Sequence, residues 1–208
     1  MSGSCCEEKR FDGASSAYKK VLWAVIFINL SLFLIEIIAA KAGQSQALQA
    51  DALDFLGDGV TYTLSLLVIG HSLKLRSNVA LFKGISLSVI ACWVLGSTLY
   101  HFFVLQEPQP LIMSTIALLA LAANLLSVLL LMRFREGDSN VRSVWLCSRN
   151  DAIGNVAVLI AAGVVWLTHT AWPDLIVALI MSGLFFNSSI QIIRQVRQEK
   201  LQLSLIHI

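Results

Sequence analysis

The chain has 208 residues, of which 57% are hydrophobic and 13% are charged, and its mean hydropathy is +0.75. Soluble domains carry about 25% charged residues, so this composition predicts a polytopic membrane protein built from helices of about 20 apolar residues. The net charge of +2 is too small to indicate a nucleic-acid partner, and the four cysteines show no spacing typical of a disulfide framework.

The first segment, residues 1–17, is polar and has no hydrophobic periodicity, and we expect a flexible cytoplasmic arm. Its adjacent Cys5 and Cys6 allow two interpretations: a site for soft metal ions or acylation, or two incidental thiols. The apolar run that follows is too long for the h-region of a cleavable signal peptide.

Six apolar runs separated by short connections predict an all-α membrane protein, a six-transmembrane-helix bundle over residues 18–195. We expect residues 196–208 to form a short cytoplasmic tail, whose last six residues resemble translated adaptor sequence. For that reason His207 enters no metal argument. The runs cover approximately residues 18–40, 47–70, 79–105, 111–134, 141–168 and 173–193.

The Lys and Arg residues predict the orientation of the bundle. All of them except Lys41 and Arg149 fall at helix ends that share one side, which places both termini in the cytoplasm. The connections on the other side carry Glu107 and Asp174. Arg149 lies inside the fifth run but about 200° around the helix from its polar face, so we expect it to snorkel or to form a structural ion pair.

The second run carries a polar stripe. Asp51, Asp54, Asp58, Thr61 and Ser65 are spaced three or four residues apart and share one helix face. Each Asp at bilayer depth costs about 2.5–3.5 kcal/mol on insertion scales, so such residues line a pathway or bind something. The alternative is a helix packed inside a bundle with protonated or hydrogen-bonded carboxyl groups.

The fifth run carries a second polar face, on which Cys147, Asp151 and Asn155 repeat every four residues. Residues four apart lie side by side on a helix, about 5–6 Å between Cβ atoms. The pair Cys147 and Asp151 therefore matches the pair Asp54 and Asp58, and together they supply the four side chains of a tetrahedral divalent-metal site. The two helices run antiparallel, so a compact site requires tilt or crossing.

At these residues the chain resembles the cation diffusion facilitator (cation efflux) family of metal–proton antiporters, over residues 29–200. In that family the second and fifth helices each typically provide His or Asp, three residues, then Asp, which together bind the transported ion, and the proteins are commonly homodimeric. The resemblance rests on Glu36, on the segment SQALQADA (45–52) before Asp54 and Asp58, and on NVR (140–142) before Cys147 and Asp151.

The chain departs from the family pattern at three places. Asp54 stands where zinc-transporting members often have His, and Cys147 stands at the equivalent position of the fifth helix. Residues 135–140 are too short to form a His-rich loop between the fourth and fifth helices. The family's usual cytoplasmic ferredoxin-like domain does not follow the sixth helix in this sequence.

The resemblance implies a multi-pass protein of the cell (inner) membrane that exports a divalent transition metal in exchange for protons. Zinc or cadmium is favoured because a thiolate joins the carboxylates. Implied partners are the lipid bilayer, divalent metal ions, protons and a second copy of the chain, with no permanently bound cofactor, no nucleic acid and no enzymatic activity. The metal ligands would be Asp54, Asp58, Cys147 and Asp151, with Asp51, Glu36 and Asn155 in a proton path or supporting the ligands. A non-transporting metal-binding sensor or heterodimer partner is the alternative.

Overall fold

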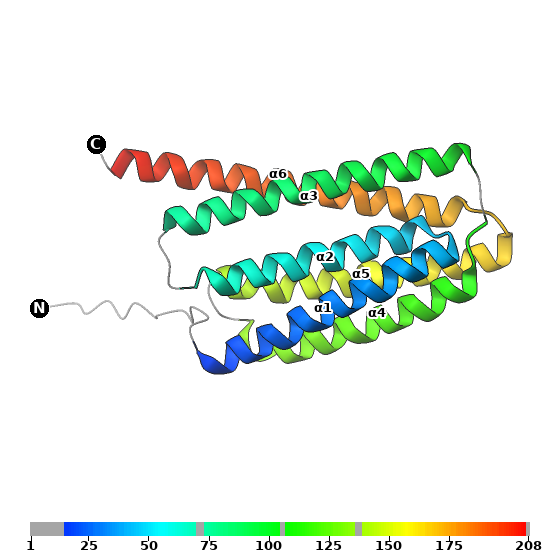
Figure 1. Ribbon diagram of the computed structural model, residues 1–208, viewed down its shortest axis with the longest axis horizontal. Helices are drawn as coiled ribbons and strands as arrows, with labels where there is room; N and C mark the ends of the chain where they lie inside the picture. The colour runs from blue at the N-terminus through cyan, green and yellow to red at the C-terminus, as the bar shows by residue number, and fades with distance from the viewer. Residues whose placement is uncertain (1–14, 70–72, 105–106, 136–138, 207–208) are drawn as a thin grey trace, which may run out of the picture.

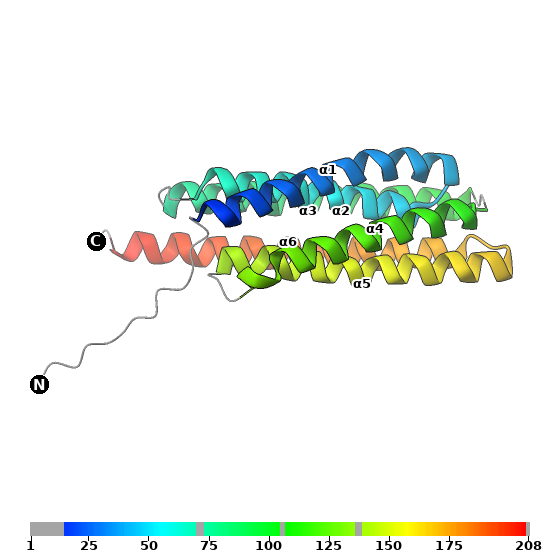
Figure 2. The same cartoon turned by 90° about the horizontal axis from the view of Figure 1, so that it is seen from below.

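The computed structural model describes residues 15–69, 73–104, 107–135 and 139–206. These residues form six long α-helices that lie roughly along one axis, and α1 begins at the same end of the bundle at which α6 finishes (Figures 1 and 2). The elements are α1 (Ser16–Gly43), α2 (Gln46–Leu67), α3 (Leu73–Phe103), α4 (Pro110–Leu131), the 3-10 turn η1 (Met132–Phe134), α5 (Ser139–Thr168) and α6 (Trp172–Ile206).

The all-helical prediction is confirmed for the described residues, and five of their helices are long and apolar enough to cross a membrane. The exception is α2, because three aspartates interrupt its apolar sequence. Its 22 residues would reach about 33 Å, which is enough for the hydrocarbon core of a bilayer. The count of six membrane spans therefore stays a prediction.

Three predicted helix boundaries were wrong. Helix α3 starts at Leu73 and α5 at Ser139, inside stretches expected to be the connections 71–78 and 135–140. Helix α6 continues to Ile206, through most of the segment expected to be a tail. Hydropathy marks the apolar part of a helix, and these helices extend past it into polar sequence. The arm with Cys5 and Cys6, up to residue 14, and His207 lie outside the described residues.

The helices form two groups. Helices α1, α2, α4 and α5 pack chiefly among themselves, while α3 packs most extensively against α6 (Figure 1). Helix α2 contacts α1, α3, α5 and α6, so it lies between the two groups. Helix α2 therefore has neighbours in both groups, and its Asp51 and Asp58 are buried between helices.

Small residues bring α3 and α6 together. A Cβ atom on Gly84 would lie 3.0 Å from Cγ1 of Ile193, so a larger residue there would push the helices apart. The Ser189 hydroxyl donates to the Gly84 carbonyl at 2.6 Å, and the Ser182 hydroxyl donates to the Ala91 carbonyl at 3.0 Å. Close backbone approach with hydroxyl hydrogen bonds is a typical way for helices to associate in membranes.

A buried carboxylate joins the start of α2 to the start of α6. Asp174 is 1% exposed and lies in the first turn of α6, not in a loop as expected. It accepts hydrogen bonds from the Ser45 hydroxyl at 2.5 Å and from the backbone N–H groups of Gln46 at 2.7 Å and Ala47 at 3.2 Å. The Ser45 oxygen also accepts from the Leu48 N–H at 3.0 Å and caps α2.

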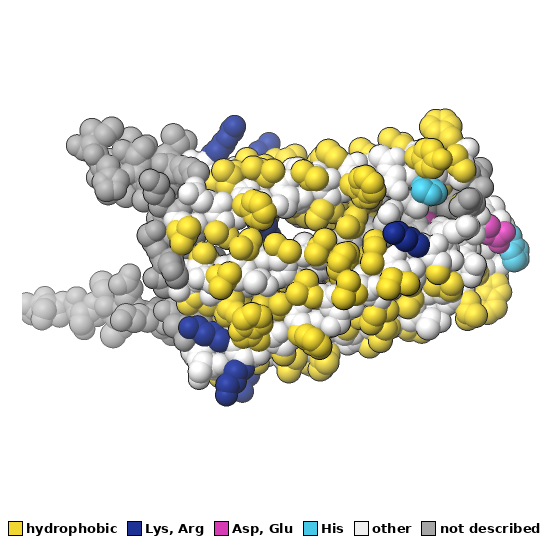
Figure 3. Space-filling model, in the orientation of Figure 1, with side chains coloured by type: hydrophobic (Ala, Val, Ile, Leu, Met, Phe, Trp, Pro, Cys, Tyr) yellow, Lys and Arg dark blue, Asp and Glu magenta, His cyan; other side chains and the backbone are white. Residues whose placement is uncertain are grey.

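The surface of the bundle is apolar along its length, as a lipid-facing surface must be (Figure 3). Lys and Arg side chains gather at the end where α1 begins, and Asp, Glu and His appear at the opposite end (Figure 3). At that opposite end the imidazole Nδ1 of His169 lies 2.9 Å from the Glu107 carboxylate, and both side chains are exposed. The exposed bases of the first end include Lys19, Lys20, Arg133, Arg135, Arg194 and Arg197.

Removing the Asp174 carboxylate should destabilise the bundle. In Asp174→Ala the Ser45 hydroxyl and two backbone N–H groups lose their acceptor in a buried place, which costs about 2–3 kcal/mol. Equilibrium unfolding in mixed detergent micelles would measure this loss. The control is Glu107→Ala at the same end, which removes an exposed carboxylate and should change stability by less than about 0.5 kcal/mol. Equal stability of the two variants would contradict a structural role for Asp174.

Candidate metal centre

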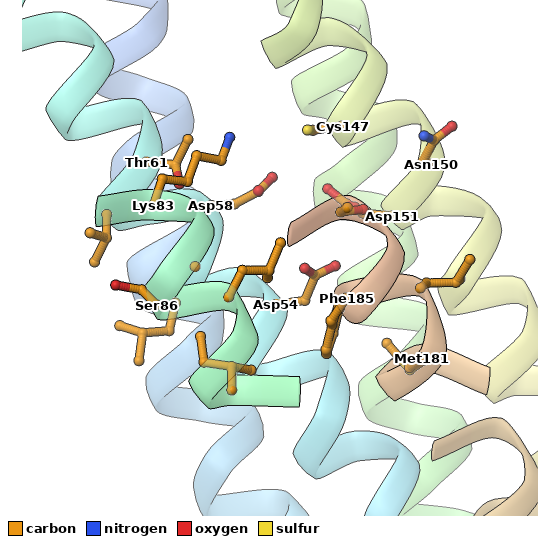
Figure 4. Close-up of a pocket in the computed structure, with 18 of the residues that line it drawn as sticks. Asp54, Asp58, Thr61, Lys83, Ser86, Cys147, Asn150, Asp151, Met181 and Phe185 are labelled. Atoms are coloured by element: carbon orange, nitrogen blue, oxygen red, sulfur yellow. The ribbon is translucent and has the colours of Figure 1, made fainter. Parts of the chain in front are cut away.

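A cavity of about 710 Å³ lies between α2, α3, α5 and α6. Asp54 and Asp58 line it from α2, and Cys147 and Asp151 line it from α5, so the structure brings the four predicted ligands to one space. Figure 4 shows the three carboxyl groups turned toward the space between these helices, with the Cys147 sulfur about one helical turn along α5 from Asp151.

The four side chains do not form a closed coordination shell. Among the described residues, no three His, Cys, Asp or Glu side chains are gathered tightly enough to hold a metal ion as they stand. The carboxyl group of Asp151 is nevertheless a side-chain neighbour of both Asp54 and Asp58. The pairs on α2 and α5 therefore lie close to each other in this cavity.

Tyr62 forms a hydrogen bond with one of these carboxyl groups, that of Asp58. Its hydroxyl, which is buried, donates a hydrogen bond to Asp58 and lies 3.5 Å from the carbonyl oxygen of Val144 on α5. The sequence analysis missed Tyr62 because it read this aromatic residue as part of an apolar run. Its position four residues after Asp58 was the available signal.

Lys83 on α3 is also a lining residue of this cavity. The sequence predicts Lys83 among the basic residues at the helix ends, and this prediction is wrong for its side chain. That side chain is half-buried and points into the cavity (Figure 4). Its charge acts on Asp54, Asp58 and Cys147. No spacing signal relates it to those residues, because it comes from a separate helix.

Asp51, although on the same stripe, belongs to a different polar cluster. It is 1% exposed, and with the Asn155 amide nitrogen turned toward it, it accepts from that nitrogen at 2.5 and 3.1 Å. The Asn155 oxygen then accepts from Asn124 Nδ2 at 2.9 Å. Glu36 of α1 is fully buried next to Asp51, and its two carboxyl oxygens have no hydrogen-bond donor among the described residues.

Arg149 points away from the cavity, as predicted. It is exposed, its guanidinium carbon lies 5.4 Å from the centroid of the Trp145 ring, and its Nη2 donates to Asn150 Oδ1 at 3.3 Å. The cation–π contact takes the place of the ion pair that had been considered.

The chain is similar in sequence to known proteins over most of its length. A family model described as the cation efflux transmembrane domain matches residues 22–199. The zinc transporter ZitB of Escherichia coli is 27% identical over 84% of this chain and 60% of its own length. A cadmium, cobalt and zinc/H(+)-K(+) antiporter of Bacillus subtilis is 24% identical over 83% of this chain and 60% of its own length. The metal cation efflux system protein CzcD of Cupriavidus metallidurans is 26% identical over 70% of this chain and 50% of its own length. The chain thus spans about 60% of the length of the first two relatives and half of the third.

The buried amide cluster yields a stability prediction. Among the described contacts, Asn155 is the only amide that donates a hydrogen bond to Asp51, and Asn155→Ala removes it. The substitution also leaves Asn124 without its acceptor, so the free energy of unfolding should fall by about 2–3 kcal/mol. Asn187→Ala, on the exposed face of α6, is the matched control and should change it by less than about 0.5 kcal/mol. Unfolding of both variants in mixed micelles would compare them, and a stable Asn155→Ala protein would contradict this network.

Proposed function

The chain belongs to the cation efflux family, and from this premise we propose that it carries a divalent transition-metal ion out of the cytoplasm in exchange for protons. The observation that supports the proposal most directly is that Asp54, Asp58, Cys147 and Asp151 line one cavity. Four donors from two helices match the number that a tetrahedral divalent ion requires. The ion is the substrate, and it would be bound transiently between α2 and α5.

The donor set favours zinc or cadmium. Carboxylates alone suit hard ions such as Mn²⁺, but the Cys147 thiolate adds a soft ligand that favours Zn²⁺ and Cd²⁺. Among the described residues, the lining of this cavity includes no histidine, so the proposed preference rests on carboxylate oxygen and thiolate sulfur. Relatives named for zinc, cadmium and cobalt are consistent with this choice.

Binding requires the cavity to close around the ion. The four donors line a cavity of about 710 Å³, and α3 and α6, which form its other walls, pack mainly against each other. The pair α3–α6 can therefore shift as a unit against the four other helices. We propose that this shift exposes the site alternately to the two sides of the membrane.

Protons and metal compete for the same groups. Carboxyl groups buried together hold protons when no cation neutralises them, and a metal ion displaces protons from its ligands when it binds. Protons arriving from outside would then release the metal and reset the carrier. Asp51, Glu36 and Asn155 would provide a proton path next to the ligands, since their buried cluster begins one helical turn from Asp54.

The basic end of the bundle gives the proposed orientation. Both α1 and α6 have their basic ends there, so the positive-inside rule puts this end in the cytoplasm, with α2 as a sixth span. On this reading metal leaves toward the end that carries Glu107 and His169. We further propose that the protein works as a homodimer in the cell (inner) membrane, as the family resemblance implies.

Transport assays in proteoliposomes test the proposed ligands. Asp58→Asn and Asp151→Asn keep side-chain size but remove a charged ligand, so uptake of Zn²⁺ and Cd²⁺ should fall at least about a hundredfold. Glu107→Ala, outside the cavity, should transport like the parent protein. Full transport by either Asn variant would overturn the mechanism. Stoichiometric metal binding by the parent without proton-coupled flux would indicate the sensor or heterodimer partner instead.

Thiol chemistry tests Cys147. In a protein whose other cysteines are replaced by serine, saturating Cd²⁺ should slow the reaction of Cys147 with N-ethylmaleimide at least about tenfold, because a metal-bound thiolate is not free to attack. Adding Asp151→Asn should remove this protection. A protein that retains only Cys92, which is exposed on α3 outside the cavity, is the control and should react equally with and without Cd²⁺. An unprotected Cys147 at saturating metal would exclude it as a ligand.

A further inference from the structure

We propose that Lys83 is a tethered cation of the metal site: its ammonium group neutralises the ligand carboxylates when the cargo has left, and the arriving metal ion has to displace it. This inference rests on the proposed function, because it assigns a role in setting affinity and release to a residue that is not a ligand.

The placement of Lys83 is the first observation. It lies on α3, whereas all four proposed ligands lie on α2 and α5, and yet its side chain lines their cavity. Figure 4 shows its amino end turned into the space beside Thr61 and Asp58. All four proposed ligands line the same cavity as this amino group.

Its environment is the second observation. The bases at the end of the bundle where α1 begins, such as Lys20 and Arg197, are exposed, whereas Lys83 is half-buried among the apolar residues of the cavity wall. A cation taken out of water is stabilised by acidic groups in its surroundings, and the acidic side chains that line the same cavity are those that would bind the metal. The long, flexible stem of lysine allows the ammonium to approach or leave these carboxylates without movement of the backbone.

A divalent ion and an ammonium group cannot share these carboxylates without repulsion. The ammonium therefore weakens metal binding, and a carrier benefits from this because a cargo bound too tightly is released slowly. The position of Lys83 on α3 also links its effect on metal binding to the movement of that helix. Since α3 and α6 form the group that would shift against α2 and α5, the distance from the ammonium to the ligands would change with each transport step.

Calorimetric titration of the detergent-purified full chain with Cd²⁺ tests the proposal. Lys83→Met removes the charge and keeps an unbranched apolar stem, so the dissociation constant should fall at least about tenfold. Lys83→Arg keeps the charge and should stay within about threefold of the parent. Lys20→Met removes an exposed positive charge outside the cavity and should have no effect, which controls for a general change of surface potential.

Transport kinetics separate this role from a structural one. For Lys83→Met we expect a lower KM for metal together with a lower maximal rate, because tighter binding slows release, and Lys83→Arg should restore both. Unchanged or weaker Cd²⁺ binding by a folded Lys83→Met protein would overturn the proposal. Titration of Asp58→Asn with Cd²⁺ distinguishes failure of the tethered-cation proposal from failure of the proposed metal site. If Asp58→Asn abolishes binding while Lys83→Met binds like the parent, only the tethered cation fails, whereas retained binding in Asp58→Asn means that the proposed metal site itself is wrong.

Discussion

The structure depends on keeping the carboxyl groups of α2 away from lipid. Each of these acids has a polar partner or neighbour, either on α2 itself or on another helix. Asp58 receives the Tyr62 hydroxyl, which also approaches α5, and Asp51 receives the Asn155 amide of α5. Because a carboxylate in hydrocarbon is so costly, α2 has to be enclosed by α1, α3, α5 and α6, and the other five helices carry the candidate lipid-facing spans. The central place of α2 follows from its three aspartates.

The same enclosure divides the acids of α2 between two environments. Asp51 faces the interior of the four-helix group, where Asn155 and Glu36 surround it. Asp54 and Asp58 face the boundary between this group and the α3–α6 pair. A single turn of helix thus separates a buried cluster of polar side chains from the cavity at the boundary between the two helix groups. Proton storage and metal binding would then be neighbouring but distinct tasks.

The sequence predicted those parts of the site that repeat along one helix. The spacing of four residues predicted the two pairs of proposed ligands, which the structure places on one cavity, because neighbours on a helix face follow from helix geometry alone. Lys83 could not be found this way, because it reaches the cavity from a third helix. The distribution of Lys and Arg along the sequence grouped it with the basic residues at the helix ends. The role of Asp174 was missed for the same reason, because its partners lie 127 to 129 residues earlier in the chain. The predicted helix boundaries were wrong where a helix extends past its apolar part into polar sequence, as at Leu73 and Ser139.

The wall opposite the ligands explains how such a site could open without losing its ion. Helix α6 lines the cavity mainly with apolar side chains, among them Met181 and Phe185, which also belong to the buried core. The four proposed ligands all lie on α2 and α5, so the proposed coordination requires no side chain of α6. A shift of α3 and α6 would therefore break no metal–ligand bond. It would change only two things: access of water to the ion, and the distance of Lys83 from the carboxylates. On this proposal the ligands stay on one group of helices while Lys83 lies on the other, so a shift of the α3–α6 pair would change both access to the ion and the strength of its binding.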